Sequence, residues 1–387
     1  MRKLISILGS TGSIGLTTLS IVDKKPKYFK PYIFSANKNY RLICLQIKKY
    51  KPTFFFIKNE KIFEKIKKKF KSNRTKIINN FDIKYFSNVS NITVLAIPGI
   101  AGLSPTLTMI KKSKKILIAN KESIICGWNL INNYSSKYKT EIIPVDSEHY
   151  SILKLLQNTN LDSIEKVYLT ASGGPFLGYK HDQLKKIKPQ HALKHPKWKM
   201  GKKITIDSST LMNKVLEYIE AQKLFKIPNN KLDILIHPES LVHAVIKFKN
   251  GLTKFIYHDT SMIVPIANAI FDNNLEIDRF YKVKKNIKNL TFKIPKKSNY
   301  PIIKILKKVN EYPSTSIIIN ASNEVLVDHF LRKKLPFLDI PLMIEKILRD
   351  INYKKYAIRN PKDLTQINKI NSWAKIKTIQ KIKAKYG

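Results

Sequence analysis

The sequence predicts an α/β protein that begins with a doubly wound parallel sheet and continues into an α+β domain and a C-terminal helical domain. A chain of 387 residues, 43% of them hydrophobic, exceeds what one core usually holds, so we expect two or three domains. Apolar runs alternate with amphipathic, lysine-rich stretches over residues 1–146, which is typical of a parallel sheet covered by helices. Residues 299–387 show helical spacing with few glycines.

The first predicted element is an apolar strand at residues 4–8, followed by GSTGSIG at 9–15 and an amphipathic helix. Glycines at this spacing let a backbone approach a pyrophosphate, and the amides of the helix N-terminus then bind its charge. This order is typical of a dinucleotide-binding, Rossmann-like βαβ unit. A purely structural turn is the alternative, because the spacing is G-x-x-G-x-x-G rather than G-x-G-x-x-G.

Further strands are predicted at residues 32–35, 53–57, 94–97, 116–119 and 142–145. The second strand leads to Asn37, Lys38 and Asn39, where a lysine rather than an acidic residue follows the strand. A lysine suits the 2′-phosphate of NADP, whereas an acid would bind the ribose hydroxyl of NAD. The last strand ends at VDSEH, residues 145–149, and open α/β sheets bind ligands at the carboxyl ends of their strands.

Asp146 and Glu148 flank Ser147 in a chain with only 27 acidic residues against 72 basic ones. Two neighbouring carboxylates share either a proton or a cation. The alternative interpretation is a pair of ordinary salt bridges in a lysine-rich protein.

A third acid, Glu217, lies on a helix that we expect to begin at residues 207–210, which are good capping residues. Asn213 and Lys214 are its i−4 and i−3 neighbours, so the three form one polar cluster near the helix start. Such a cluster suits a phosphate, with Glu217 one turn deeper for a metal. A capped surface helix with an ion pair is the alternative.

The middle of the chain predicts strands at residues 167–170, 234–236, 244–248 and 253–257. A tight turn at SGGP, 172–175, exposes a hydroxyl and backbone amides, and HPKWKMG, 195–201, has the composition of an active-site lid, although a histidine and a tryptophan in a loop usually only pack. Residues 272–298 form a connection. Helices are then predicted at residues 302–309, 316–332, 338–351 and 363–386.

The formal charge of +45 raises the possibility of nucleic-acid binding, but the lysines are scattered and form no basic stripe. We therefore expect no nucleic-acid partner. Cys44 and Cys126 are too few and too far apart for a disulfide framework, so buried free thiols are expected. No apolar run reaches membrane-spanning length, and the first strand begins almost at Met1, so we expect a cytoplasmic protein without a membrane partner.

Several motifs resemble, in order and spacing, the 1-deoxy-D-xylulose 5-phosphate reductoisomerase family. They are LGSTGSIG (8–15), ANKES (119–123), VDSEH (145–149), ASGGPF (171–176), HPKWKMG (195–201), DSSTLMNKVLEYIEA (207–221), HPES (237–240) and INASNEV (319–325). The resemblance implies metal-dependent isomerisation of 1-deoxy-D-xylulose 5-phosphate through retro-aldol and aldol steps, then reduction by NADPH to 2-C-methyl-D-erythritol 4-phosphate. It also implies Mg²⁺ or Mn²⁺ as cofactor and a homodimer.

The family's functional residues fall on defined positions of this chain. Metal ligands are Asp146, Glu148 and Glu217, and residues assisting the chemistry are Lys121, Glu148 and His195. Substrate contacts are Lys121, Ser147, Glu148, Ser172, His195, Trp198, Ser208, Asn213, Lys214 and Glu217. NADPH contacts are Thr11, Gly12, Ser13, Ile14, Asn37, Lys38, Asn39, Asn120, Glu122, Met200 and Gly201.

The implied domains are an NADPH-binding Rossmann-like domain over residues 1–146, a catalytic α+β domain over 147–271 with a flap at about 172–202, a linker over 272–298, and a helical domain over 299–387. Asn37 and Val215 stand where many family members have glycine, and neither change removes a reacting group. Two other classes stay open: an NADP-dependent dehydrogenase without isomerase chemistry, and a basic nucleic-acid-binding protein on a degenerate Rossmann scaffold.

Overall fold

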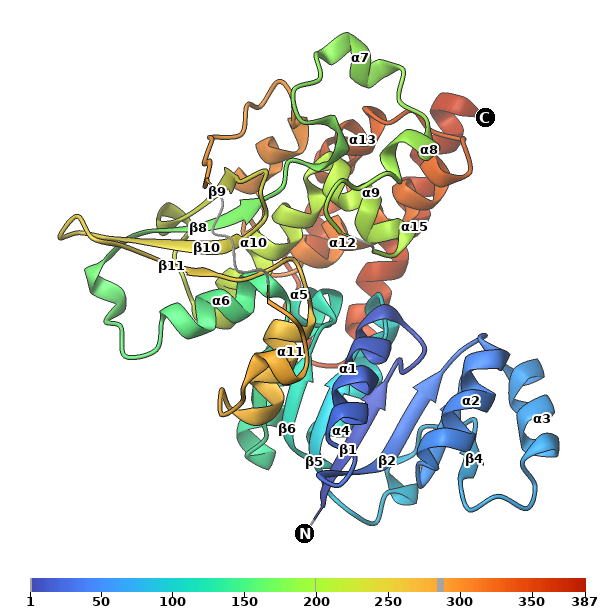
Figure 1. Cartoon of the computed structure of the whole chain (residues 1–387). Coiled ribbons are helices and arrows are strands. Elements are labelled where there is room, and N and C mark those ends of the chain that lie inside the picture. Colours follow the sequence, from blue (N-terminus) through green and yellow to red (C-terminus); the bar gives the residue numbers. More distant parts are fainter. Residues whose placement is uncertain (1, 199, 284–288) are drawn as a thin grey trace. The chain divides into compact units, whose positions relative to one another are not determined.

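The computed structural model describes residues 2–198, 200–283 and 289–387 (Figure 1). Lys199, in the predicted flap, and residues 284–288, in the predicted linker, lie outside the described residues. By their contacts, the residues form two units: Met1–Ser123, Asn129–Tyr150 and Ser261–Lys285 in the first, and Ile124–Trp128, Ser151–Thr260 and Asn286–Gly387 in the second. Each unit is described by itself.

The first unit contains a seven-stranded parallel sheet with the strand order β4-β3-β2-β1-β5-β6-β7. The strands are β1 (Lys3–Leu8), β2 (Phe29–Ala36), β3 (Phe54–Ile57), β4 (Lys76–Ile78), β5 (Ser90–Leu95), β6 (Ser113–Ile118) and β7 (Glu141–Pro144). From β1 the chain adds strands β2 to β4 on one side, and it then returns to add β5 to β7 on the other side. The sheet is therefore doubly wound, as the sequence predicts. Only β4 was not predicted, because three residues are too short for a clear pattern.

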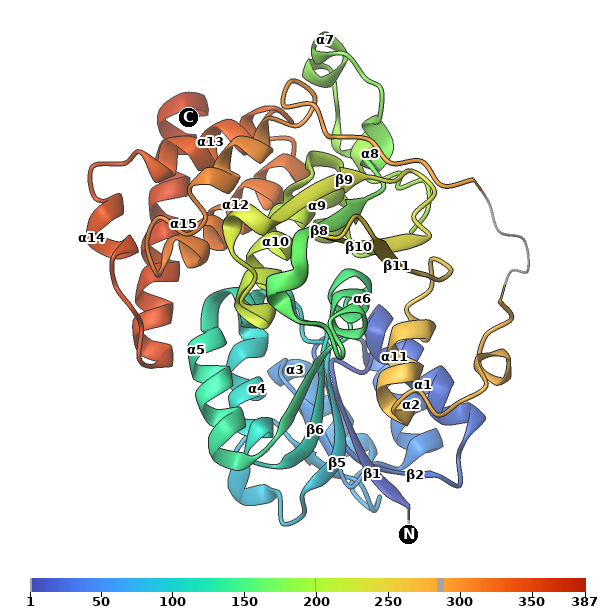
Figure 2. The ribbon, with the colours of Figure 1, turned by 90° about the vertical axis from the view of Figure 1, so that its left-hand side faces the viewer.

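Helices cover both faces of this sheet: α1, α2 and α11 lie on one face, and α4 and α5 on the other (Figure 2). The helices of the first unit are α1 (Ser13–Lys24), α2 (Tyr40–Tyr50), α3 (Glu60–Lys69), α4 (Leu103–Ile110), α5 (Lys121–Tyr138) and α11 (Ile263–Phe271), with 3-10 turns η1 (Ile83–Tyr85), η2 (Ile100–Gly102) and η6 (Ile277–Arg279). α6 (Ser147–Leu155) begins in this unit and ends in the second. Because α11 packs on α1 and β6, residues 261–271 belong to the first unit by contact, whereas the sequence placed them in the catalytic domain.

The core of the first unit is built from the strands at the centre of the sheet. Ile5, Ile7 and Leu8 of β1 are fully buried, since a central parallel strand is covered on both faces. This burial fixes β1 in place, and the loop that follows it therefore starts from a rigid position. Cys44 and Cys126 are buried and form no disulfide, as predicted.

The second unit contains a four-stranded mixed sheet with the order β11-β10-β8-β9. Its strands are β8 (Ile164–Ala171), β9 (Leu232–Ile236), β10 (Val242–Phe248) and β11 (Thr253–Tyr257). β8 pairs parallel with β9 and antiparallel with β10, which in turn pairs antiparallel with β11. All four strands match predicted ones.

Helices pack on this sheet and beside it. They are α7 (His181–Lys185), α8 (Pro189–Ala192), α9 (Lys202–Thr210), α10 (Met212–Phe225), α12 (Thr315–Leu331), α13 (Asp339–Leu348), α14 (Tyr353–Ala357) and α15 (Leu364–Tyr386), with 3-10 turns η3 (Leu161–Ser163), η4 (Gly174–Phe176), η5 (Asn229–Lys231) and η7 (Pro301–Lys307). α10 packs on β8 and β9, and α12 packs on α9, α13 and α15. Since the catalytic and helical segments share one contact unit, their division into two domains stays a prediction.

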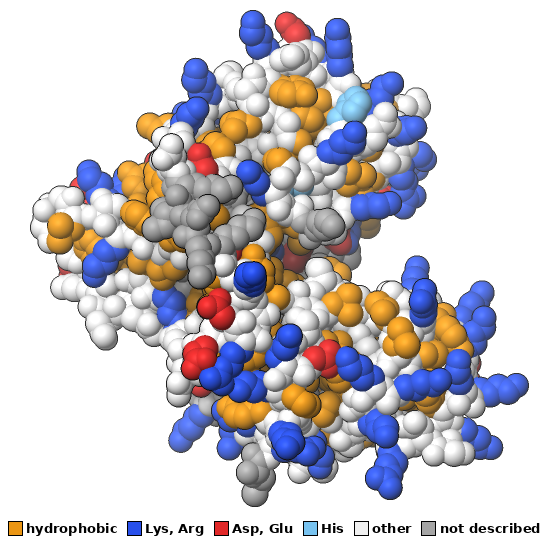
Figure 3. Space-filling view, viewed as in Figure 1, with side chains coloured by type: hydrophobic (Ala, Val, Ile, Leu, Met, Phe, Trp, Pro, Cys, Tyr) orange, Lys and Arg blue, Asp and Glu red, His pale blue; other side chains and the backbone are white. Residues whose placement is uncertain are grey.

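The surface is basic without a continuous basic stripe on the face drawn in Figure 3, where Lys and Arg side chains are spread widely. Among the described residues, none of the helices combines the length and the apolar character that crossing a membrane requires.

Candidate active site

The glycine loop between β1 and α1 has two positions that only glycine fits. Gly9 has φ +89°, and a Cβ there would lie 2.6 Å from the carbonyl oxygen of Ala96. At Gly15 a Cβ would lie 2.4 Å from the carbonyl oxygen of Gly9. The loop is therefore folded tightly against the start of α1, as a pyrophosphate-binding turn requires.

The N-terminus of α1 faces solvent at this loop. Gly12 precedes the helix without a side-chain cap, and the first turn holds no acidic residue. Gly12 and Ser13 are exposed, and Thr11 and Ile14 are half-buried. Amides at an uncapped helix start, together with the helix dipole, attract an anion.

A buried glutamine on α2 holds the same loop from behind. The Oγ of Ser10 donates to Oε1 of Gln46 at 2.6 Å, and Nε2 of Gln46 donates to the carbonyl oxygen of Ser10 at 2.9 Å. Ser35 at the end of β2 also accepts from the backbone N–H of Gly9 at its Oγ, at 2.9 Å. Sequence reasoning missed Gln46, because nothing in its local pattern distinguishes it from a surface polar residue.

Asn37, Lys38 and Asn39 are exposed at the carboxyl end of β2. Oδ1 of Asn39 caps α2 by accepting from the N–H of Leu42 at 3.1 Å. Asn37 is not among the described non-glycine residues with positive φ, so its replacement of glycine causes no backbone strain here. Lys38 leaves a positive charge at this edge of the sheet.

Asn120 is the buried N-cap residue of α5, two positions before Glu122. Its Oδ1 accepts from the N–H of Ser123 at 2.6 Å, while its Nδ2 donates to the carbonyl oxygens of Ile97 and of Gly99, the latter at 2.9 Å. Asn120 thus ties the loop after β5 to the loop after β6. Its side chain holds these two loops together at the carboxyl edge of the sheet.

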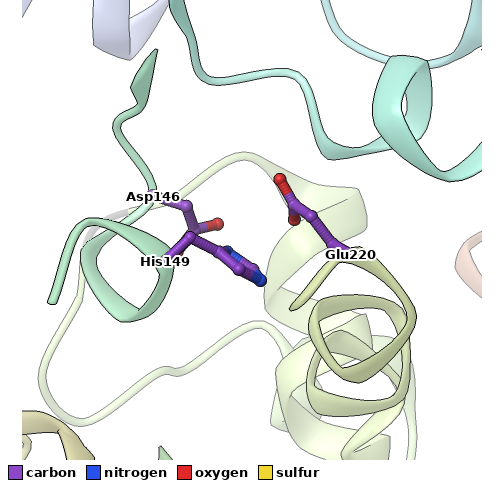
Figure 4. A group of neighbouring side chains, drawn as sticks. All are labelled: Asp146, His149 and Glu220. Atoms are coloured by element: carbon purple, nitrogen blue, oxygen red, sulfur yellow. The ribbon is translucent and has the colours of Figure 1, made fainter. Parts of the chain in front are cut away.

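The acids of VDSEH lie where the sequence placed them, at the junction of β7 and α6. The chain turns there: Asp146 precedes the helix, and its carbonyl oxygen accepts from the N–H of Tyr150 at 2.8 Å. The carboxylate of Asp146 pairs with Nζ of Lys121 at 2.9 Å, and Oγ of Ser147 donates to Oε2 of Glu148 at 2.7 Å. Figure 4 shows Asp146 and His149 projecting from this junction.

These groups lie in a largely dehydrated environment. Ser147 is 5% exposed, Glu148 9% and Lys121 7%. Carboxylates removed from water need a cation or hydrogen-bond donors beside them. The surface salt-bridge alternative therefore does not apply to Glu148.

In the second unit, His195 joins two serines that the sequence predicted at the substrate. Its Nε2 lies 3.2 Å from Oγ of Ser172 and 3.1 Å from Oγ of Ser208. Its Nδ1 accepts from the backbone N–H of Lys197 at 3.2 Å and of Trp198 at 3.0 Å. Because a backbone N–H can only donate, Nδ1 carries no proton, and the single imidazole proton lies on Nε2 between the serines.

The environment of His195 keeps the imidazole neutral. Burial lowers its pKa below the ordinary value, and the nearby Lys214 ammonium lowers the pKa further. His195 is therefore a neutral donor at Nε2 in this arrangement. Two hydroxyls, an imidazole N–H and an ammonium together form an anion-binding cluster.

Lys214, Asn213 and Glu217 form the predicted polar cluster on α10. Nζ of Lys214 and Nδ2 of Asn213 both donate to the carboxylate of Glu217, which is 1% exposed. Glu220, drawn in Figure 4, lies on the same helix and is equally buried. Val215, the second departure from the family pattern, is fully buried within α10. The exposed-helix alternative is wrong for this segment.

The start of this helix differs from the prediction. Residues 207–210 do not begin it; they end α9, and α10 begins at Met212. Leu211 separates the two helices with φ +65° and is 2% exposed. Since leucine rarely adopts positive φ, no residue type in the sequence signals the break. The break places Ser208 at the end of one helix and Lys214 at the start of the next.

The SGGP turn and the flap are built around Ser172 and Trp198. Gly173 and Gly174 have φ +83° and +67°, and the carbonyl oxygen of Gly173 accepts from the hydroxyl of Tyr300 at 2.8 Å. Trp198 packs edge-on against His243, which stacks on His258 at 4.1 Å. Met200 is half-buried and Gly201 is exposed.

A pocket of about 640 Å³ is lined by the turn and flap residues Ser172, Phe176, His191 and Lys197, among others.

Three family models match the chain. They are 1-deoxy-D-xylulose 5-phosphate reductoisomerase over residues 5–127, its C-terminal domain over 142–225, and a DXP reductoisomerase C-terminal domain over 259–377. A protein of Pelagibacter ubique (strain HTCC1062) with the same name is 43% identical over 384 residues, covering 97% of this chain and 98% of the relative. The chain belongs to the 1-deoxy-D-xylulose 5-phosphate reductoisomerase family. The family expected from the motifs is thereby confirmed.

Other reductoisomerases agree over the full length. The protein of Clostridium novyi (strain NT) is 37% identical over 395 residues and covers 100% of both chains. The solved reductoisomerase of Zymomonas mobilis in complex with NADPH is 28% identical, with a TM-score of 0.88 and 99% of each chain covered. A reductoisomerase in complex with NADPH, fosmidomycin and magnesium is 28% identical, with a TM-score of 0.91 and 98% of each chain covered. The predicted fold class is confirmed.

The sequence analysis gave no role to two residues that the structure places near the candidate site. Asn323 lies in INASNEV, a motif that was noted without a function, and His243 was not noted at all. Asn323 reaches α9 through a buried hydrogen bond, and His243 supports Trp198. The INASNEV motif could have pointed to Asn323. Nothing in the sequence points to His243, because it is an isolated histidine in a strand.

Proposed function

We propose that this chain converts 1-deoxy-D-xylulose 5-phosphate to 2-C-methyl-D-erythritol 4-phosphate, with NADPH as reductant and Mg²⁺ or Mn²⁺ as cofactor. The reaction belongs to isoprenoid precursor biosynthesis. The observation that carries the proposal is the anion-binding cluster of Ser172, His195 and Ser208 beside Lys214, in a chain of the reductoisomerase family. A simple dehydrogenase needs no such cluster.

The phosphate of the substrate is held by Ser172, Ser208, Asn213 and Lys214, with His195 donating from Nε2. A neutral imidazole keeps its N–H directed at the two hydroxyls, and the Lys214 ammonium supplies the positive charge. Holding this end of the substrate keeps the detached fragment in place while carbon–carbon bonds break and form. Trp198 covers the site as part of the flap, and His243 supports its ring.

The divalent cation is held by Asp146, Glu148 and Glu217. Oxygen donors without thiolate or imidazole suit a hard ion, and the acids are largely or fully removed from water. A cation held by these residues would supply Lewis-acid chemistry to the substrate oxygens. Ser147 contacts the substrate hydroxyls and orients Glu148 through its hydrogen bond. Nζ of Lys121 and the carboxylate of Glu148 assist proton transfer to and from the substrate oxygens.

NADPH binds at the carboxyl edge of the first sheet. The fit rests on the two positions where a Cβ would collide, Gly9 and Gly15, and on the uncapped start of α1. The contacts are Thr11, Gly12, Ser13 and Ile14 at the glycine loop, Asn37, Lys38 and Asn39 at the end of β2, Asn120 and Glu122 at the start of α5, and Met200 and Gly201 in the flap. Reductoisomerases solved with NADPH support this choice of cofactor.

We further propose that the chain acts as a homodimer in the cytoplasm and that neither a membrane nor a nucleic acid is its partner. The family resemblance supports dimerisation, and the scattered lysines argue against a nucleic-acid surface. Light scattering coupled to size-exclusion chromatography tests the dimer, and a monomer at micromolar concentration would contradict it.

The test of the function is a spectrophotometric assay. Purified protein, NADPH, Mg²⁺ or Mn²⁺ and 1-deoxy-D-xylulose 5-phosphate are mixed, and the loss of NADPH absorbance is followed beside a chelator-treated control. Metal-dependent oxidation and formation of the methylerythritol product are expected. Folded, NADPH-binding protein that does not oxidise NADPH would overturn the proposal, and metal-independent reduction of simple aldehydes would favour a dehydrogenase.

A further inference from the structure

Asp207 is a buried carboxylate to which the reaction assigns no role. It lies in the last turns of α9 directly before Ser208, and it is 1% exposed. A carboxylate near a helix C-terminus is disfavoured by the helix dipole, and burial adds a desolvation cost. Asp207 therefore needs hydrogen-bond or ion-pair partners that offset both costs.

The partners of Asp207 come from two helices. Its Oδ2 pairs with Nζ of Lys203, one turn earlier on α9, at 2.8 Å. Its Oδ1 accepts from Nδ2 of Asn323 at 2.8 Å, across 116 residues of sequence. Asn323 is fully buried in the middle of α12, although asparagine is a poor helix former. A charge-assisted bond between two buried side chains holds its geometry firmly.

The bond holds α9 at the point where it presents Ser208. Ser208 follows Asp207 directly, and its Oγ lies 3.1 Å from Nε2 of His195. α9 ends at Thr210, and after Leu211 α10 begins and carries Lys214. α12 is itself fixed against α13 and α15, so it is a rigid support for this junction.

We propose that Asp207 and Asn323 are positioning residues for the phosphate site: α12 fixes the α9–α10 junction, and with it Ser208 and Lys214, through the Asn323–Asp207 hydrogen bond. Neither residue contacts the substrate. The inference rests on the proposed function, because the anion held at this junction is the phosphate of the sugar substrate.

A matched pair of substitutions on α12 tests the proposal. Asn323→Ala removes the bond to Asp207. Asn320→Ala removes an equally buried asparagine one turn earlier, whose amide points to Sγ of Cys126 at 3.7 Å instead. We expect Asn323→Ala to raise KM for the sugar phosphate about tenfold and to leave KM for NADPH unchanged. Asn320→Ala should lower Tm similarly and leave both KM values unchanged.

A side-chain exchange separates positioning from general stability. Asn323→Asp places two carboxylates against each other, so KM for the sugar phosphate should rise further. In the double variant Asp207→Asn with Asn323→Asp, an amide and a carboxylate face each other again. We expect the double variant to recover part of the lost affinity, because the amide–carboxylate bond is restored while Lys203 has no carboxylate at position 207. No recovery, or equal KM values in Asn323→Ala and Asn320→Ala, would overturn the proposal.

Failure of the proposed function is recognised separately, because the unsubstituted chain would then show no metal-dependent oxidation. In that case the positioning role is tested with inorganic phosphate alone, by the increase in Tm that added phosphate produces. The unsubstituted chain and Asn320→Ala should be stabilised, and Asn323→Ala should not. Equal stabilisation of all three, or of none, would overturn the inference.

Discussion

Nδ1 of His195 accepts hydrogen bonds from two backbone N–H groups of the flap, and Nε2 donates to the serine hydroxyls. Protonation of Nδ1 would therefore break its hydrogen bonds to the flap. Burial and then Lys214 lower its pKa below 6.5. A lowered pKa means that the fold favours the neutral form; this contribution is complete above pH about 6.5 and is lost as pH falls through the lowered value. We expect kcat/KM to fall on the acid side of that window.

The variant His195→Gln separates this effect from titration of the substrate phosphate, whose second pKa is about 6. Glutamine does not titrate, so the variant should be less active at neutral pH but should show a shallower acid limb. The measurement is kcat/KM between pH 5 and 8, about three units that span the ordinary pKa of histidine. An acid limb of equal steepness in both proteins would show that His195 does not cause it.

In the proposed metal site, Glu217 supplies a carboxylate that its neighbours cannot replace. Its carboxylate accepts from Lys214 and Asn213 and is almost fully buried, so Glu217→Gln keeps the shape but removes a charged oxygen donor. We expect turnover to fall on the order of 100-fold or more, since cation-based charge stabilisation is worth several kcal/mol. NADPH affinity should change little. Full activity at saturating Mg²⁺ or Mn²⁺ would remove Glu217 from the metal ligands.

At the scale of elements, α2 supports the glycine loop through Gln46, which makes two hydrogen bonds to Ser10. Gln46→Leu replaces the side chain by an apolar one of similar size and removes both hydrogen bonds to Ser10. Each bond contributes roughly 1 kcal/mol, so we expect KM for NADPH to rise about tenfold. KM for the sugar phosphate is the internal control. Equal changes in both constants would indicate general destabilisation instead of loosening of the loop.

Most strands could be predicted from the sequence, whereas the α9–α10 break could not. Buried strands such as β1 are continuous apolar runs bounded by turn residues, so local composition identifies them. The break depends on Leu211 in a left-handed conformation, which burial of its side chain stabilises and no local pattern encodes. The prediction that residues 207–210 begin a helix was wrong for this reason.

For the whole molecule, the charge of +45 should act on anionic substrates at a distance. A positive potential speeds the encounter with NADPH and the sugar phosphate, and salt screens it over about 10 Å at 0.1 M. We expect kcat/KM for both substrates to fall severalfold between low and physiological ionic strength, with kcat little changed. Rates that do not respond to salt would show that the scattered lysines do not contribute.

The candidate site could be predicted only in part. Its reacting groups lie in motifs, because carboxylates, serines and a histidine at fixed spacing are visible in a sequence. Its supporting groups, such as Gln46 and Asn323, act over distances of 36 and 116 residues. Such pairings depend on how helices pack, and the spacing of residues along one segment does not contain that information.

α12 bonds to several other helices among the described residues: Oγ of Ser316 donates to the carbonyl oxygen of Ile125 in α5 at 3.1 Å, and Asn323 donates to Asp207 in α9. A chain shortened before Thr315, for example to obtain a smaller fragment for expression or crystallisation, would leave a buried carboxylate without its donor and an apolar helix face in water. The C-terminal helices are therefore not a removable appendage. Fragments intended to keep the proposed sugar-phosphate site intact should extend through α12 and the helices that pack on it.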